Sequence, residues 1–327
     1  MAADHNPNPL NAPAARMPAV PPVGQPREDR TGLGILIMCA VAVIFAFQDG
    51  LSRLLGGEYP PVLVVMLRFW FFALFVVVLV ARQPGGLRRA VRSKHPWLQI
   101  FRGVLLVAEV VVMVEAFVRL GLVETHAIFT ASPLLVAALS GPILGEKVGW
   151  RRWTAILIGL CGILIVLKPG QAVFQPAAIL PLIAALMFAI YGLATRYVSR
   201  DDPSMVSFFW TGISGAVAIT VVGIWQWEWL APVDWVWMLA LCLTAVAGHY
   251  LLIRAYELAE ASALQPFAYT QLVWASVIGV IFFGDVVKPN VVVGAAVVVA
   301  AGLFTLWRER QKAAPRRSSP ASRPPAS

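Results

Sequence analysis

Residues 116–146 read AFVRLGLVETHAIFTASPLLVAALSGPILGE, and residues 255–285 read AYELAEASALQPFAYTQLVWASVIGVIFFGD. Both stretches begin with Ala and an aromatic residue and end with Gly and an acid, and 29 positions separate Ala from Gly in each. A weaker match relates residues 45–51 (FAFQDGL) to residues 188–193 (FAIYGL), which are one residue shorter. The chain therefore contains an internal repeat, with one copy in each half.

The repeat lies in a strongly apolar chain. Of its 327 residues, 59% are hydrophobic and 13% are charged, whereas soluble domains carry about 25% charged residues. Apolar runs of about 20 residues cross the hydrocarbon layer of a membrane as helices. We therefore predict an all-α integral membrane protein with ten transmembrane helices. They are expected near residues 32–54, 61–81, 97–118, 124–144, 152–167, 175–195, 204–226, 235–253, 262–283 and 290–307.

The lysines and arginines indicate how these helices are oriented. If the N-terminus lies in the cytoplasm, most of them fall in cytoplasmic loops and tails, with Arg68 and Arg102 set aside as intramembrane residues. This bias is the positive-inside pattern, and it favours ten crossings with both termini in the cytoplasm. The opposite side of the membrane would carry only Arg53, Arg119, Lys168 and Lys288.

Each half contains five predicted helices, and an odd number of crossings inserts the second half upside down relative to the first. This is the inverted-repeat plan of many secondary transporters, in which one site between the repeats is exposed alternately to each side. We assign the first repeat to residues 32–168 and the second to 173–307. The Pro-, Ala- and Ser-rich segments 1–31 and 308–327 are predicted to be disordered cytoplasmic tails, because such compositions cannot bury a core.

Several functions are disfavoured by the sequence. The net charge of +9 is spread over short loops and tails, so no nucleic-acid partner is expected. Cys39, Cys161 and Cys242 are too scattered for a metal site and odd in number for a disulfide framework. The chain has no His-Glu-x-x-His and no Walker A sequence, so we expect neither an enzyme nor an ATP-driven pump, and no cofactor. A channel or a receptor-like membrane protein is the rival class.

The residues around the repeat landmarks resemble a known family. Residues 133–170, which include Gly145-Glu146 and Lys168-Pro169-Gly170, are similar to the first EamA repeat of the drug/metabolite transporter superfamily. The counterpart in the second half ends in Phe283-Gly284-Asp285. The resemblance covers about residues 32–307. It implies a multi-pass carrier of small organic metabolites in a bacterial inner membrane.

Two short stretches are similar to particular branches of that superfamily. They are Gly248-His249-Tyr250 and residues 266–271 (PFAYTQ), which resemble bacterial carriers of riboflavin or S-adenosylmethionine. Amino acids and drugs are alternative substrates within the same fold. Import, export and exchange stay open, as does proton coupling against facilitated diffusion.

Arg68, Glu109 and His249 lie in predicted helices without an opposite charge three or four positions away. Because an ionisable group in hydrocarbon is costly, their partners must come from other helices. Arg68 is expected to pair with Glu109 or Asp49, which would lock the bundle or bind an anionic substrate group. His249 suits proton coupling, or it is a neutral histidine hydrogen-bonded between helices. Asp49 pairs with Arg53 one turn away or lines a cavity.

Aromatic and amide side chains of the second half suggest a planar solute. They are Tyr191, Trp210, Tyr250, Tyr269, Gln271 and Trp274. A cavity with flat faces and a few polar tips suits an aromatic or vitamin-like molecule such as riboflavin. The predicted substrate-binding residues, with no catalytic residue and no metal ligand among them, are Asp49, Arg68, Glu109, Tyr191, His249, Tyr269, Gln271 and Trp274.

Glycines and prolines are expected to shape the helix ends. Gly145 and Gly284 should each end a helix, with Glu146 and Asp285 facing the N-terminus of the helix that follows in sequence. Pro133 is expected to kink the helix that contains it.

The predicted helices near 152–167 and 290–307 carry several glycines. Small residues let helices approach closely in a membrane, so these helices offer a contact face for a second copy. A homodimer is therefore left open.

Overall fold

The computed structural model describes residues 28–144, 150–167, 176–198, 201–258, 264, 267 and 269–313. Within these ranges every regular element is a helix. Six segments are long and apolar enough to cross a membrane, and three shorter helices are also apolar. The chain is thus an all-helical, multi-pass membrane protein. The six are Gly32–Glu58, Pro61–Ala81, Leu122–Ile143, Pro176–Thr195, Met205–Gln226 and Asp234–Leu252, and the shorter three are Trp153–Leu167, Thr270–Phe283 and Pro289–Phe304.

The helices of the first half follow the predicted runs closely. Proline occupies the first position of α2 and α4, where its missing N–H would have no helical partner. The first-half elements are α1 (Glu28–Glu58), α2 (Pro61–Ala81), α3 (Gly86–Val91), α4 (Pro96–Leu120), α5 (Leu122–Phe129), α6 (Ser132–Leu144) and α7 (Trp150–Leu167).

The second half repeats this plan. Two of its helices are joined to short 3-10 turns, η2 before α8 and η3 after α9. The second-half elements are η2 (Pro176–Ala178), α8 (Ile179–Val198), α9 (Ser204–Gly223), η3 (Ile224–Gln226), α10 (Asp234–Leu258), α12 (Thr270–Phe283) and α13 (Pro289–Ala313).

The first and last helices are longer than predicted. Helix α1 begins at Glu28 and α13 continues to Ala313, into segments that were expected to be tails. Acidic residues precede α1's apolar run and basic residues end α13, and both suit the helix dipole. Residues 1–27 and 314–327, where disordered tails are predicted, lie outside the described residues.

The predicted helix at 124–144 is two helices, α5 and α6, separated by a turn at Thr130 and Ala131. Pro133 lies in the first turn of α6, and α5 ends at Phe129, whose carbonyl would otherwise accept the missing N–H of Pro133. The predicted interruption at Pro133 is therefore present, as a break between two helices and not as a kink in a continuous one. The repeat aligns Thr130 with Tyr269, which is also a turn residue just before a helix. Broken helices of this kind surround the binding sites of many transporters.

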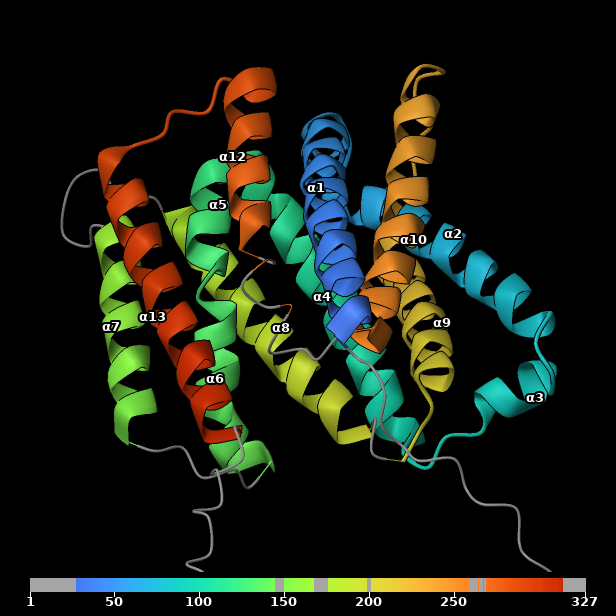
Figure 1. Cartoon of the computed structure of the whole chain (residues 1–327). Coiled ribbons are helices and arrows are strands. Elements are labelled where there is room, and N and C mark those ends of the chain that lie inside the picture. Colours follow the sequence, from blue (N-terminus) through green and yellow to red (C-terminus); the bar gives the residue numbers. More distant parts are fainter. Residues whose placement is uncertain are drawn as a thin grey trace, which may run out of the picture.

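Figure 1 shows α1 between α10 and α12, and α7 beside α13 at one side of the bundle. The α7–α13 contact depends on glycine. A Cβ at Gly162 would lie 2.8 Å from the Gly294 carbonyl oxygen, and a Cβ at Gly294 would lie 2.5 Å from that of Gly162. The glycines proposed as a contact face for a second copy therefore pack α7 on α13 within one chain.

Asp202 ties the loop before α9 to the start of α4. Its carboxylate accepts hydrogen bonds from Ser93 Oγ, from the Lys94 N–H at 2.9 Å and from Gln99 Nε2 at 2.9 Å. Gln99, which is fully buried, also donates to Ser207 Oγ at 3.1 Å. Burial by itself raises the pKa of Asp202, but the hydrogen bonds from Ser93, Lys94 and Gln99 outweigh it and hold the pKa below its ordinary value.

Replacing Asp202 with alanine is expected to lower the free energy of unfolding by about 1–3 kcal/mol, because buried donors lose their acceptor. A carboxylate with a lowered pKa stabilises the fold fully above the ordinary aspartate pKa of ~4, and this stabilisation is lost as the pH falls below it. The unfolding temperature of Asp202→Ala in detergent should therefore lie below that of the wild type, and this difference should shrink below pH 4. Asp201→Ala changes the exposed neighbour and should hardly lower the unfolding temperature. A difference between wild type and Asp202→Ala that does not vary with pH would contradict the stabilising role of the Asp202 carboxylate.

Candidate substrate site

Three polar side chains from three different helices meet inside the bundle. Gln271 Nε2 on α12 donates to Asp49 Oδ2 on α1 at 3.0 Å. His126 Nε2 on α5 lies 3.2 Å from the same carboxylate oxygen. We call Asp49, His126 and Gln271 the Asp49 cluster. It brings together both halves of the chain and two of the residues predicted from the sequence.

His126 was not among the predicted site residues. The residue is 4% exposed, and its ring stacks on Phe117 with centroids 5.3 Å apart. Its Nε2 is close enough to Asp49 for an ion pair, but it is not aligned as a hydrogen bond and has no other partner among the described residues. His126 lies close to the predicted start of a helix, a position normally at the membrane surface. Its place inside the stronger repeat was the signal that could have identified it.

Arg68 on α2 and Glu109 on α4 are also interior, with 9% and 5% exposed. The charges of Asp49 and Glu109 both act on the Arg68 guanidinium. Within the described ranges, however, no hydrogen bond or ion pair connects Arg68 or Glu109 to another side chain. The predicted partners are thus electrostatic neighbours of Arg68, and its donors remain open to a further group.

Among the described residues, His249 on α10 is hydrogen-bonded to its own helix and not to another helix, as one of its two predicted roles required. Its Nδ1 donates to the Ala245 carbonyl at 2.8 Å, because a carbonyl oxygen can only accept. The ring packs against Phe45 and Phe72, with centroids 5.2 and 6.0 Å away. This is the geometry of a histidine hydrogen-bonded within its own helix and packed between helices.

Three predicted aromatic residues lie apart from the Asp49 cluster. Tyr191 lies beneath the Arg102 guanidinium, whose carbon is 5.2 Å from the ring centre. A Cβ on Gly302 would lie 2.0 Å from the Tyr269 hydroxyl, so Tyr269 packs against α13. Trp274 is 44% exposed. Tyr191 therefore contacts Arg102, Tyr269 contacts α13 and Trp274 is exposed, and none of these observations places them in the Asp49 cluster.

Asp285 follows α12 and bridges two other helices. Its Oδ1 accepts from Arg53 Nη1 of α1 at 2.7 Å, and its Oδ2 accepts from the N–H groups of Leu122 and Val123, which begin α5, at 2.8 and 3.3 Å. The Arg53 guanidinium also lies 4.3 Å over the Phe283 ring. We call these contacts of Asp285 with Arg53, Leu122 and Val123 the Asp285 clamp.

The Asp285 clamp corrects two predictions. Gly284 ends α12 at a φ of +67° as predicted, but Asp285 faces the N-terminus of α5 instead of that of α13. The Asp285 N–H bonds back to the Gly279 carbonyl at 3.0 Å, which keeps Asp285 against the α12 end, next to the unsatisfied N–H groups of α5. Arg53 pairs with Asp285 and leaves Asp49 to the Asp49 cluster. Residues 145–149, with Gly145 and Glu146, lie outside the described residues.

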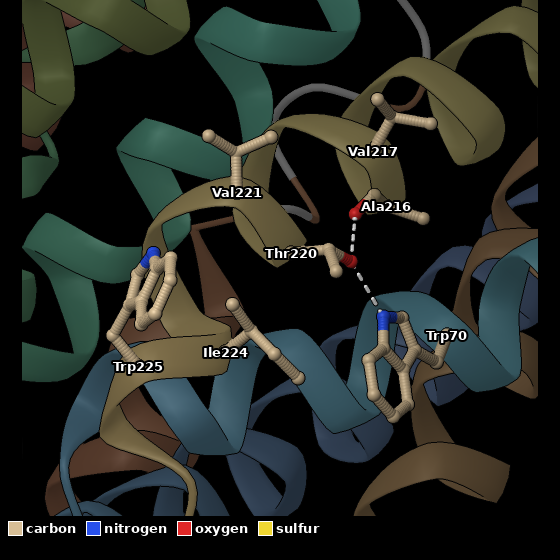
Figure 2. A pocket seen from close by; sticks show the side chains of 7 residues that line it. All are labelled: Trp70, Ala216, Val217, Thr220, Val221, Ile224 and Trp225. Atoms are coloured by element: carbon tan, nitrogen blue, oxygen red, sulfur yellow. Dashed lines mark hydrogen bonds between the residues drawn. The ribbon is translucent and has the colours of Figure 1, made fainter.

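A cavity of about 540 Å³ lies between α2, α9 and η3, and Figure 2 shows the side chains that line it. Trp70 Nε1 donates to Thr220 Oγ1 at 2.7 Å, and this hydroxyl donates to the Ala216 carbonyl at 2.6 Å. The lining contains no charged residue and none of the candidate site residues. This cavity is mainly apolar and separate from the candidate substrate site. Its lining residues are Trp70, Ala216, Val217, Thr220, Val221, Ile224 and Trp225.

Comparison with curated proteins finds transporters of similar length. The S-adenosylmethionine uptake transporter of Rickettsia prowazekii is 22% identical over 88% of this chain and 96% of its own. The riboflavin transporters of Rhizobium johnstonii and Vibrio cholerae are 28% and 29% identical, over 86% and 85% of this chain and 94% of each relative.

A protein of known crystal structure has the same fold, with a TM-score of 0.60 and 16% identity over 84% of this chain and 97% of the other. The family model described as the EamA-like transporter family matches residues 32–168 and again residues 175–307. Both copies of the internal repeat are therefore accounted for by one family, and the chain belongs to the EamA-like transporter family.

Proposed function

We propose that this protein is a secondary transporter that moves a small organic metabolite across a bacterial inner membrane by alternating access, with no enzymatic step. Ten crossings are proposed from the nine apolar segments together with α4, which is 25 residues long. The halves would then be inverted, with both termini in the cytoplasm, as the positive-inside pattern favours. The named relatives that cover most of the chain are transporters.

The observation that carries this proposal is the convergence of ionisable groups in the interior. Asp49, Arg68, Glu109 and His126 come from four helices, and three of them are at most 9% exposed. Such groups are costly in a membrane and mark substrate or ion pathways. The proposed site thus lies between α1, α2, α4, α5 and α12.

The charges favour an amphoteric substrate. Arg68 has no hydrogen-bonded partner among the described residues, and a guanidinium binds a carboxylate through two parallel hydrogen bonds. Asp49 and Glu109 would receive a cationic group of the same molecule. Amino acids and S-adenosylmethionine have this chemistry, and relatives named as S-adenosylmethionine uptake transporters support it.

A planar solute such as riboflavin is the second candidate. Three phenylalanine rings lie against the two interior histidines, Phe117 on His126 and Phe45 and Phe72 on His249. Flat rings of this kind can stack on an aromatic solute. Relatives named as riboflavin transporters support this alternative.

Flux into proteoliposomes tests the function. Purified protein should give saturable uptake of radiolabelled S-adenosylmethionine, an amino acid or riboflavin above that of protein-free liposomes. The same ligand should raise the unfolding temperature in detergent, since binding to the folded state stabilises it by mass action. Saturation by riboflavin alone would favour the planar candidate. The absence of both flux and thermal shift with all of these solutes would overturn the proposed substrate classes.

A further inference from the structure

Helices α1, α5 and α12 are joined by two layers of contacts, which lie one turn apart on α1 and on α5 and at opposite ends of α12. On α1, Asp49 lies one turn before Arg53, and on α5, Val123 lies one turn before His126. The Asp285 clamp joins Arg53 to the α5 N-terminus, and the Asp49 cluster joins Asp49 to His126. Gln271 and Asp285, at the two ends of α12, complete the respective layers. A change in one layer therefore acts directly on the helices held by the other.

His126 and Asp49 form a buried acid–base pair, but no aligned hydrogen bond joins them. Nε2 of His126 is 3.2 Å from Asp49 Oδ2, but this nitrogen is buried and forms no aligned hydrogen bond with any described residue. A neutral imidazole that presents a lone pair to a carboxylate is not attracted to it. A protonated imidazole donates from both nitrogens and makes a charge-assisted hydrogen bond to the same oxygen.

We propose that the His126–Asp49 pair is a proton-binding site and that proton binding tightens the Asp285 clamp. The proton converts a pair of net charge −1 into a neutral ion pair, and a buried unpaired charge is costly. The stronger α1–α5 contact then keeps Arg53 and the N–H groups at the start of α5 within hydrogen-bonding distance of Asp285. The site rests on the proposed function only for its role, which is to couple transport to a proton gradient.

The charges around the pair are largely balanced. On α5, Glu124 pairs with Lys288 at 3.1 Å, and on α1, Arg53 pairs with Asp285. Arg68 of α2 and Glu109 of α4 are interior groups that form no ion pair among the described residues, and His249 of α10 donates to its own helix. Asp49 is the carboxylate in direct contact with His126, at 3.2 Å. Glu109 is a second interior acid, so Glu109→Gln should keep the pH dependence of the Asp285 clamp if the His126–Asp49 pair is the proton site.

Amide hydrogen exchange measures how stable the Asp285 clamp is, and it needs no substrate. The Leu122 and Val123 N–H groups donate to Asp285, so their protection from exchange measures how long the clamp stays closed. The experiment follows these amides in detergent-purified full-length protein at pH 5.5 and pH 8, with intrinsic exchange rates divided out. Protection should be at least about fivefold higher at pH 5.5, the lower end of usual coupling between two sites.

Variants identify the proton site. His126→Gln and, independently, Asp49→Asn should remove the pH dependence, whereas Asp285→Asn should lower protection at both pH values. His95→Gln is the matched control, because His95 also faces an aspartate, Asp201 at 2.9 Å, at a different part of the molecule; it should leave the pH dependence unchanged. Protection that does not vary with pH in the wild type, or that varies equally in the His126 and Asp49 variants, would overturn the proposal. Because no substrate is added, this outcome is independent of the flux test.

Discussion

Replacing Arg68 with alanine is expected to reduce substrate uptake by about 10- to 100-fold. A hydrogen bond to a charged group contributes about 1.5–3 kcal/mol, and this is the affinity that the substrate carboxylate would lose. Glu109 and Asp49, whose charges act on Arg68, would also remain without their cationic neighbour. Initial rates of uptake into proteoliposomes over a range of substrate concentrations measure the loss.

Two further variants show whether this effect belongs to the site. Arg68→Lys keeps the charge but loses the planar fork, so it should recover only part of the uptake. Arg82→Ala makes the same chemical change at the exposed C-cap of the same helix and should transport normally. Full uptake by Arg68→Ala would remove this residue from substrate binding and favour the alternative in which it locks the bundle.

Replacing Asp285 with alanine is expected to lower the free energy of unfolding by about 3–5 kcal/mol, as when one partner of a buried ion pair is removed. The Asp285 and Arg53 side chains are only 10% and 16% exposed. Arg53 would keep a largely buried charge without its partner, and two N–H groups of α5 would lose their acceptor. Denaturant unfolding in detergent micelles, followed by circular dichroism, measures the change.

Glu115→Ala is the control for this prediction. Glu115 pairs with Arg119 one turn away on α4, and that arginine is 60% exposed. Such exposed pairs on one helix contribute about 0.3–0.5 kcal/mol. If Asp285→Ala costs no more than Glu115→Ala, the Asp285 clamp does not stabilise the fold, and its coupling to the Asp49 cluster loses its basis.

The helices and their order could be predicted because hydropathy is a property of consecutive residues. The runs at 61–81 and 152–167 fall within two residues of α2 and α7. The turn at Thr130 was harder to predict, because residues 124–144 are long and apolar enough on average to be one membrane span, with no Asp, Glu, Lys or Arg after Glu124. The break became visible only once both copies of the repeat had been placed in three dimensions.

The candidate site was predicted in part. Asp49, Arg68, Glu109 and Gln271 were predicted because polar groups inside apolar runs stand out in a sequence, and the same signal selected His249, which lies outside the proposed site. Tyr191, Tyr269 and Trp274 were selected by residue type alone, and type does not determine which way a side chain faces. His126 was overlooked for a similar reason, since its depth depends on how α5 is packed.

The sequence by itself determined that this chain is a membrane protein of two related halves and that it belongs to a transporter family. These properties depend on composition, on the length of apolar runs and on repeated spacing. Only the tertiary structure decided that Asp285 binds Arg53 and the start of α5, and that Asp49 meets His126 and Gln271. These partners lie far apart in the sequence. Helix packing decides which side chain or helix end comes within hydrogen-bonding distance of each charge.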